Sequence, residues 1–334
     1  MADVGVGERV AAYGRHRSKV VKDAVRDNHP ALKATEDAGG VVRVKGGRTY
    51  LDESLSGQNS SVGYIGEVGQ VPINNYKAVD SPEASWTYLA GSVTLSKAEQ
   101  LMNRGQGRFI DIYAAKQDAL EGSMMNVHHG GFLSSGTGTS GLQLDGMAAA
   151  ISTTPTTGTY NTIDRSSSNA AWFRNSKFDS AGDWTLGAVD AGNVKKFFDK
   201  LINNTTKDGK CQLDYFLAGS THFEFLTDAI GALQTIQNQN ANGHAGFQKL
   251  TYRGVPVYFG GGVTYSSQTA LTATRTYGVC AKKGGFNLVY MDGAEFDMMP
   301  KVDSADQAAF SSLMLTMATT SIGAFAKLCI VGFD

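Results

Sequence analysis

Residues 76–125 read YKAVDSPEASWTYLAGSVTLSKAEQLMNRGQGRFIDIYAAKQDALEGSMM, and within them an extended pattern gives way to a helical one. Residues 84–96 are rich in β-forming side chains, which predicts a strand. Beyond them, apolar residues recur at steps of three and four, which predicts one apolar helix face over about five turns. These apolar residues are Phe109, Ile112, Tyr113, Leu120, Met124 and Val127. The stretch therefore predicts a strand that leads into a long helix.

The residues before this stretch suggest a long two-stranded excursion. Strand-like runs flank a turn-rich segment between Gly57 and Ser92, although an isolated two-stranded ribbon is only marginally stable in water. Further upstream, Gly46 and Gly47 separate two short strand-like runs, VVRV and TYL, which predicts a tight hairpin. We therefore expect a ribbon that needs a partner surface.

A mildly basic arm precedes the first strand-like run. Residues 9–33 carry seven Lys or Arg against Asp23 and Asp27, with valines in loose helical spacing. Ordering a residue costs about 1–2 kcal/mol, which a few valines cannot offset. A solvated or intersubunit face is the commoner meaning of such a charge run, with binding to DNA or an acidic assembly factor as the alternative.

After the long helix, residues 130–146 are dense in Gly, Ser and Thr. This composition predicts the end of the helix and a crossing into a new unit near Leu142. Residues 194–202 then predict a short amphipathic helix, and the run DYFLAGS predicts a buried strand. Alternation of helices and strands indicates the α+β class.

The C-terminal half continues this alternation. Thr221 stands three residues before Glu224, which is the spacing of a capping box at the start of a second helix. Two strands are expected on either side of Arg253-Gly254, and the runs from Tyr277 onward read as successive strands, the last of which ends the sequence.

Bulk composition limits the possible functions. The chain has 334 residues, 42% of them hydrophobic, and a net charge of −1, so no basic field exists to hold a polyanion. No apolar run is long enough to span a membrane. The three cysteines, Cys211, Cys280 and Cys329, lie far apart without C-x-x-C spacing, which favours buried thiols over a disulfide or zinc site.

Motifs that bind nucleotides are weak or missing. Gly136, Gly138 and Gly141 spell G-x-G-x-x-G, but a helix precedes them where a dinucleotide fingerprint needs a strand. A flexible joint is the better interpretation. Neither a phosphate-binding loop nor a nucleophile elbow is present.

The histidines form no evident reactive site. His128 and His129 are adjacent on the predicted helix, which places their rings about a hundred degrees apart and argues against a shared metal. His222 and Glu224 lie in the first turn of the second helix, where Glu224 serves as a cap and His222 faces solvent. An acid–base pair formed by these two is the alternative.

Acidic residues in FDSAGDWTLGAVDAG lack the spacing of a calcium loop, so turn formation by Asp179 and Asp183 and an N-cap at Asp190 explain them better. We therefore predict no catalytic residue, no cofactor and no metal. An enzyme would require His222, Glu224 or Asp183 to converge in one pocket.

The order of the parts resembles that of a known family. An arm, a long β excursion, a long helix, a compact α+β insertion and returning strands follow one another as in tailed-bacteriophage major capsid proteins of the Hong Kong 97 fold. The sequences Asp164-Arg165-Ser166 and Trp172-Phe173-Arg174-Asn175 resemble a stretch of that family's axial domain, and GVPVYFGGG resembles a later strand of it. The resemblance covers roughly residues 50–334, and the arm is matched by position only.

The resemblance implies a Hong Kong 97-like α+β fold in five segments. These are an N-terminal arm (1–50), an extended β-loop (51–95), a peripheral domain with the spine helix (96–140), an axial domain (141–279) and peripheral C-terminal strands (280–334). It further implies self-assembly into hexamers and pentamers, which form an icosahedral head shell around double-stranded DNA. An encapsulin-like bacterial compartment shares the fold and is the alternative.

The resemblance also implies partners and contact residues. The partners are further copies of the chain, a scaffolding protein expected to be a separate chain, a portal, a cement or decoration protein, and packaged DNA on the inner face, without a membrane. The particle would assemble in the host cytoplasm and remain as the virion capsid. The expected intersubunit residues are Arg15, Arg17, Lys19, Lys22, Tyr76, Lys77 and Trp86. Lys77 has no identifiable partner asparagine, so we expect no covalent crosslink.

Overall fold

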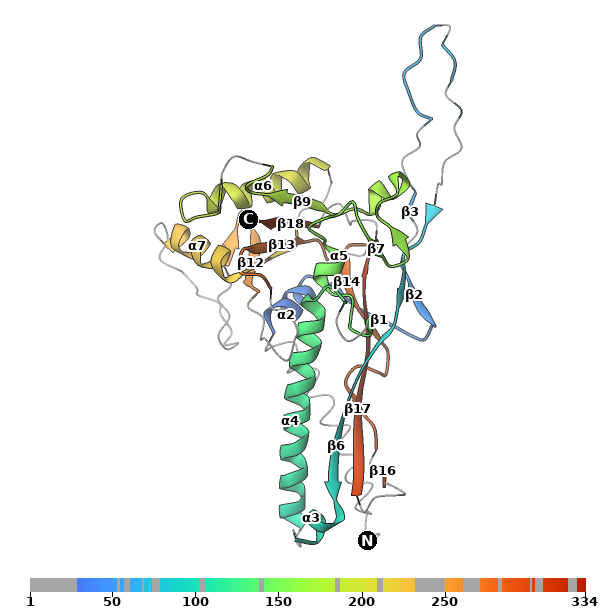
Figure 1. Cartoon of the computed structure of the whole chain (residues 1–334), viewed down its shortest axis with the longest axis vertical. Coiled ribbons are helices and arrows are strands. Elements are labelled where there is room, and N and C mark those ends of the chain that lie inside the picture. The colour runs from blue at the N-terminus through green and yellow to red at the C-terminus, as the bar shows by residue number, and fades with distance from the viewer. Residues whose placement is uncertain are drawn as a thin grey trace.

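The computed structural model describes most of the chain, and the statements below concern those residues. They are residues 29–52, 55–56, 61–67, 69–71, 73, 79–102, 106–137, 141–183, 187–208, 213–231, 250–260, 271–281, 284–300, 302–303, 309–323 and 329–334. Two six-stranded sheets and one long helix form the body of the molecule (Figure 1). No helix in these ranges is both long and apolar enough to cross a membrane.

The first sheet is built around β17 (Ala309–Ile322). It pairs antiparallel with β6 (Thr87–Ser96) over ten residues and with β14 (Phe286–Met291). β1 (Val41–Val44) lies parallel to β14. Two short strands, β15 (Asp297–Met298) and β16 (Val302–Asp303), also pair with β17. Because successive side chains of a strand point to opposite faces, one face of β6 and β17 is free to pack on a helix.

That helix is α4 (Gln106–Leu133), which has 28 residues and confirms the predicted long helix. It follows the short α3 (Lys97–Met102) and lies along β6 (Figure 1). Tyr113 packs against Val93 and Leu95 of β6 in a small apolar cluster. α4 ends at Leu133, within the glycine-rich residues 130–146 as predicted, and its final turn packs closely against residues 144–146.

Two glycines test this packing. A Cβ on Gly146 would lie 2.3 Å from the Gly131 carbonyl oxygen, whereas a Cβ on Gly122 would meet nothing within 4 Å. We expect Gly146→Ala to lower the free energy of unfolding by about 2 kcal/mol, since backbone must move. Gly122→Ala, the matched control inside α4, should raise it by about 0.5–1 kcal/mol. Urea denaturation of both variants checks this, and equal effects would contradict it.

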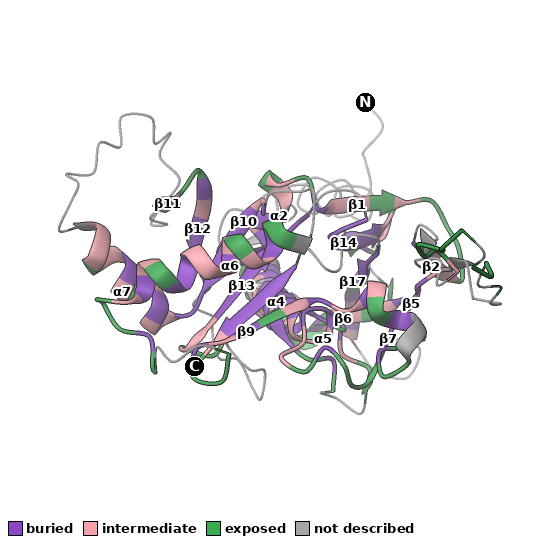
Figure 2. Ribbon diagram, turned by 90° about the horizontal axis from the view of Figure 1, so that it is seen from above, coloured by how far each residue is buried: buried purple, intermediate pink, exposed green. Residues whose placement is uncertain are grey.

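The second sheet has the strand order β11-β12-β10-β13-β18-β9. Its strands are β11 (Leu250–Tyr252), β12 (Val255–Phe259), β10 (Tyr215–Ala218), β13 (Arg275–Val279), β18 (Ile330–Phe333) and β9 (Ser176–Asp179). Helices α6 (Val194–Asp208) and α7 (Ser220–Gly231) pack on it (Figure 2). The predicted strand DYFLAGS and both predicted helices are confirmed.

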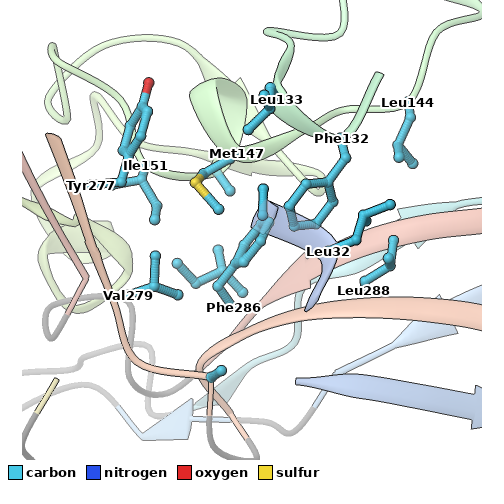
Figure 3. Packing of buried hydrophobic residues seen from close by; sticks show 14 of the residues in the cluster. Leu32, Phe132, Leu133, Leu144, Met147, Ile151, Tyr277, Val279, Phe286 and Leu288 are labelled. Atoms are coloured by element: carbon cyan, nitrogen blue, oxygen red, sulfur yellow. The ribbon is translucent and has the colours of Figure 1, made fainter. Parts of the chain in front are cut away.

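The two faces of β10 contribute to different cores. Phe216 and Ala218 pack with Phe197 and other side chains of α6, whereas Tyr215 and Leu217 belong to the larger core that joins the two sheets. In that core, side chains of α2 (Pro30–Asp37), α4, α5 (Met147–Ala150), β13 and β14 meet around Phe286 (Figure 3). The two sheets thus share one continuous interior.

The expected hairpin at Gly46 and Gly47 was wrong. β1 belongs to the first sheet, whereas β2 (Thr49–Leu51) pairs with β5 (Glu83–Ser85). The two glycines have positive φ angles of 71° and 118°, so they redirect the chain between two sheets. α2 and β1, which lie within residues 1–50, are packed in the body.

The predicted two-stranded excursion is confirmed at its root. β2 pairs with β5, and β3 (Leu55–Ser56) pairs with β4 (Val79–Asp80). We call residues 49–85 the ribbon. Its second strand ends before Trp86, not at Ser92, because the chain from Thr87 onward joins β17.

The start of α7 also differs from the expectation. The amide of Phe223 donates to the Gly219 carbonyl at 2.9 Å, so Gly219 holds the capping position and Thr221 lies inside the helix. The capping box of Thr221 and Glu224 was therefore wrong. Glycine fits here because a Cβ would lie 2.3 Å from the Thr272 carbonyl oxygen.

Candidate assembly site

The ribbon exposes apolar side chains that its own chain does not cover. Val62, Tyr64 and Ile73 are 80%, 110% and 92% exposed. The described residues between β3 and β4 (61–67, 69–71 and 73) project from one end of the molecule, away from α4 (Figure 1). Burial of an exposed apolar side chain stabilises a contact by about 1.5–3 kcal/mol, so this segment is suited to contact another molecule.

An apolar groove lies on the body itself. It has a volume of about 230 Å³ and is bordered by β6, α4, β17 and residues 142–144. Leu89, Val127 and Leu144 contribute to its walls, and Tyr88 and Leu142 at its edge are 63% and 73% exposed. The molecule thus has a projecting apolar element and a separate apolar recess.

Most of the expected intersubunit residues lie outside the described residues. These are Arg15, Arg17, Lys19 and Lys22 of the arm, and Tyr76 and Lys77 of the ribbon. Trp86 is described and is only 8% exposed. Its indole nitrogen donates to the Gly47 carbonyl at 3.0 Å, so within one chain it fastens the turn between β1 and β2.

The motif around Arg165 organises the start of the second sheet. Arg165 is 2% exposed and donates to the carbonyl oxygens of Ala149 and Ala150, while its guanidinium lies over the rings of Tyr160 and Phe173. It follows a short hairpin of β7 (Thr159–Tyr160) and β8 (Ile163–Asp164) and precedes the 3-10 helix η2 (Ser168–Phe173). These contacts hold the end of α5 against the hairpin.

Neighbouring residues of the motif have similar roles. The Asp164 carboxylate accepts from the amide and hydroxyl of Ser166. Arg174 donates to three successive carbonyl oxygens of residues 165–167. Asn175 exchanges two hydrogen bonds with the backbone of Ser152. The motif is therefore a set of turn and packing contacts.

Arg165→Met should destabilise the fold. The substitution keeps an aliphatic stem but removes two charged donors from buried carbonyl groups, and we expect the free energy of unfolding to fall by about 2 kcal/mol. Arg253→Met is the control: Arg253 is an arginine with a 54% exposed side chain that pairs with Asp199 at 2.9 Å, and its loss should cost less than about 1 kcal/mol. Chemical denaturation measures both, and equal losses would contradict the role of Arg165.

Three histidines gather where α2 meets α4. The rings of His29 and His129 stack with centroids 4.4 Å apart. His128 Nε2 lies 2.8 Å from the Tyr290 hydroxyl, whereas neither ring nitrogen of His129 has a hydrogen-bond partner. His128 and His129 are both buried, and they occupy adjacent positions of α4, the helix that the sequence predicted.

Burial decides the protonation of these rings. Desolvation, with repulsion from His29, lowers the pKa of His128 to about 4, although nearby Glu295 opposes the shift. Desolvation and repulsion from His29 and His128 lower the pKa of His129 to about 3. Burial also lowers the pKa of His29. All three rings are neutral at pH 7.

The residues considered for catalysis do not converge. His222 was expected to face solvent, but it is fully buried beside Phe197 because the first turn of α7 packs on α6. Its Nδ1 lies 2.9 Å from the Thr276 hydroxyl. Glu224 and Asp183 are exposed. The acid–base pair of His222 and Glu224 is therefore not formed.

The acidic residues form turns, as expected from the sequence, but Asp190 is not the N-cap of α6. The Phe197 amide donates to the Asn193 carbonyl at 3.0 Å, so Asn193 holds the capping position. The Asp179 carboxylate accepts from the amides of Ala181 and Gly182, and Asp190 accepts from those of Gly192 and Asn193 just before α6. Within the described ranges, no group of three or more His, Cys, Asp or Glu side chains could hold a metal.

The remaining motifs have structural positions. α4 precedes the glycine-rich run, as expected, and Gly136 has a positive φ of 75°. Gly138 lies outside the described residues. Cys280 and Cys329 are buried thiols outside any disulfide, as expected, and Cys211 is not among the described residues.

Solved structures share this fold. The capsid of cyanophage A-1(L) has a TM-score of 0.63 and 13% identity, covering 91% of this chain and 92% of that one. The capsid of the native GTA particle has a TM-score of 0.54 and 11% identity, covering 90% of each chain. The SrpI encapsulin of Synechococcus elongatus also has a TM-score of 0.54 and 11% identity, covering 90% of this chain and 86% of that one.

These likenesses establish the fold. The sequence matches no protein-family model, and no curated protein sequence matches it either. The chain nevertheless has the mixed α and β fold of tailed-phage major capsid proteins, the Hong Kong 97-type fold, as its sequence resemblance implied. An encapsulin has the same fold.

Proposed function

We propose that this chain is the major capsid protein of a tailed bacteriophage, which assembles into hexamers and pentamers and forms an icosahedral shell around double-stranded DNA. The observation that carries this proposal is the ribbon with its exposed Tyr64 and Ile73. In a shell, the ribbon of each subunit would bury these exposed apolar side chains on a neighbouring copy. We propose no catalytic role.

The geometry supports contacts between unlike surfaces. The described residues of the ribbon between β3 and β4 project from one end of the molecule, while the groove beside Tyr88 lies on the body. A contact between two different surfaces of identical chains repeats from copy to copy and closes into rings when the rotation allows. Hexamers and pentamers are rings of this kind.

The proposed partners follow from a head shell. They are further copies of the chain, a separate scaffolding protein, a portal, a cement or decoration protein, and DNA on the inner face. The net charge of −1 makes strong nonspecific binding of DNA by the whole surface unfavourable, so DNA contact would be confined to basic segments. The particle would assemble in the host cytoplasm and persist as the virion capsid.

An encapsulin-like compartment is the second candidate, favoured by the likeness to the SrpI encapsulin. Its shell would form without scaffold or portal and would enclose an enzyme. Genes for a portal and a terminase next to the gene for this chain would contradict it.

Electron cryomicroscopy of the purified protein tests the proposal. The chain should be prepared at high concentration, alone and together with the scaffolding protein. We expect hexamers, pentamers or shells of uniform curvature, and assembly that depends on the scaffold favours the phage capsid. Strictly monomeric protein in both preparations would contradict a shell-forming role, and closed particles that contain a host enzyme would favour the encapsulin.

A further inference from the structure

Buried polar contacts hold the root of the ribbon to the first sheet. Asp52, between β2 and β3, is 6% exposed, and its carboxylate accepts a hydrogen bond from the Ser321 hydroxyl at 2.5 Å. Ser321 is fully buried in β17 and lies opposite Asn287 of β14. A Cβ on Gly323 would lie 3.1 Å from the Asp52 carboxylate carbon, so this carboxylate is closely enclosed. The ribbon is thereby fastened to a strand in the interior of the sheet.

A second contact comes from the turn between β7 and β8. The carbonyl oxygen of Asn161 accepts from the amide of Glu83 in β5 at 3.1 Å. The side-chain amide of Asn161 donates to the carbonyl oxygen of Thr320 in β17 at 3.3 Å. Asn161 therefore bridges the ribbon and the first sheet.

This turn is held in an unfavourable conformation. Asn161 and Thr162 have φ angles of 46° and 66°, and a β-branched residue rarely adopts a positive φ. Such strain persists where surrounding contacts enforce it and is often found at functional positions. Here the hydroxyl of Tyr160 lies 3.0 Å from that of Thr320 and keeps the turn against β17.

The covalent connections of the ribbon to the body are short. One runs through Gly46 and Gly47, whose positive φ angles suit glycine, and the other is the single residue Trp86 between β5 and β6. Short connections that include glycine can absorb a change of direction. The polar contacts at the root therefore oppose a pivoting of the ribbon.

We propose that Asp52, Asn161, Thr320 and Ser321 form a clamp that sets the direction in which the ribbon leaves the body, and through it the angle between neighbouring copies. The second part rests on the proposed shell function. These residues act as positioning residues, because they hold the ribbon without belonging to its exposed apolar segment. A shell of uniform diameter requires this angle to be the same in equivalent copies.

The double variant Asn161→Gly with Ser321→Ala tests the clamp. Glycine retains the positive φ and the carbonyl group of residue 161, so only the amide and hydroxyl contacts are lost. Thr205→Val is the matched control, since Thr205 is also buried and donates to the carbonyl oxygens of Leu201 and Ile202 in α6, which packs on the other sheet. Hydrogen exchange of the Glu83 amide, the melting temperature and the particle diameters are measured for wild type and both variants.

We expect the Glu83 amide to exchange about tenfold faster in the double variant than in the control, at similar melting temperatures. Wild-type and control particles should be uniform, and those of the double variant should vary in diameter. Exchange of Glu83 within twofold of wild type would overturn the clamp, and uniform diameters despite faster exchange would overturn its effect on assembly. If wild-type protein forms no particles, the proposed function fails, while the exchange rates still decide whether the clamp holds the ribbon.

Discussion

Replacing both Tyr64 and Ile73 with serine is expected to abolish particle formation and to leave the chain folded. Both side chains are almost completely exposed in the single chain, so they contribute little to its free energy of unfolding. In a shell, burial of each of these side chains on a neighbour would contribute about 1.5–3 kcal/mol to the free energy of association. Every copy of the variant would lose this contribution. Sedimentation and electron micrographs should show free subunits with an unchanged melting temperature.

The control for this prediction is a serine on the body. Leu142 is 73% exposed at the edge of the groove and lies far along the chain from the ribbon. If the ribbon carries the principal contact, Leu142→Ser should reduce particle yield less than the double ribbon variant. Normal particles from the ribbon variant would show that its apolar side chains are not needed for assembly.

Acid should destabilise the protein through the histidines between α2 and α4. Above pH 6.5 these rings are neutral in both the folded and the unfolded state. Below pH 6.5 these histidines take up protons in the unfolded chain. In the folded chain the pKa is lowered to about 4 for His128 and about 3 for His129, so both rings stay neutral until the pH falls to those values. Stability therefore falls from pH 6.5 down to about pH 4, by roughly 3 kcal/mol for each of these two residues.

Groups around the rings affect the size of this loss without changing its sign. Glu295 favours the charged form of His128, but this carboxylate is already paired with Arg43 at 2.8 Å. Tyr290 contacts His128 through its hydroxyl, and His29 repels both rings when charged. Burial is the largest cause for both residues, so acid lowers stability.

His129→Phe separates this effect from other causes of acid unfolding. Phenylalanine preserves a ring beside His29 and removes two nitrogens that have no hydrogen-bond partner. We expect the variant to be more stable at pH 5 and to show a flatter dependence of melting temperature on pH. Met125→Leu, in the same helix and without an ionisable group, should leave that dependence unchanged. An identical pH profile for His129→Phe and wild type would contradict the assignment.

Elements defined by local pattern were predicted well. The apolar spacing that includes Tyr113, Leu120 and Met124 indicated α4, and the turn at Arg253-Gly254 indicated the hairpin of β11 and β12. These signals suffice because the hydrogen bonds of a helix or a tight hairpin join residues close in sequence. The pairing of strands at the root of the ribbon was also predicted, because strand-like runs flank a turn-rich segment of the sequence.

Features that depend on distant partners were not predicted. The run after Trp86 looked like the ribbon's second strand, but β17, more than two hundred positions later, pairs with it. His222 was expected at the surface because its burial depends on Phe197 of another helix. A local pattern carries no information about which distant segment will cover it.

The sequence alone thus determined the α+β class, the long helix and the paired strands at the root of the ribbon, because each follows from residue types over short distances. Only the tertiary structure decided which strands pair and which histidines are buried. It also decided that Asp52 meets Ser321, 269 positions away, at the root of the ribbon. Such contacts arise when separate elements bury their apolar faces together, and packing then places polar groups that no spacing in the sequence links.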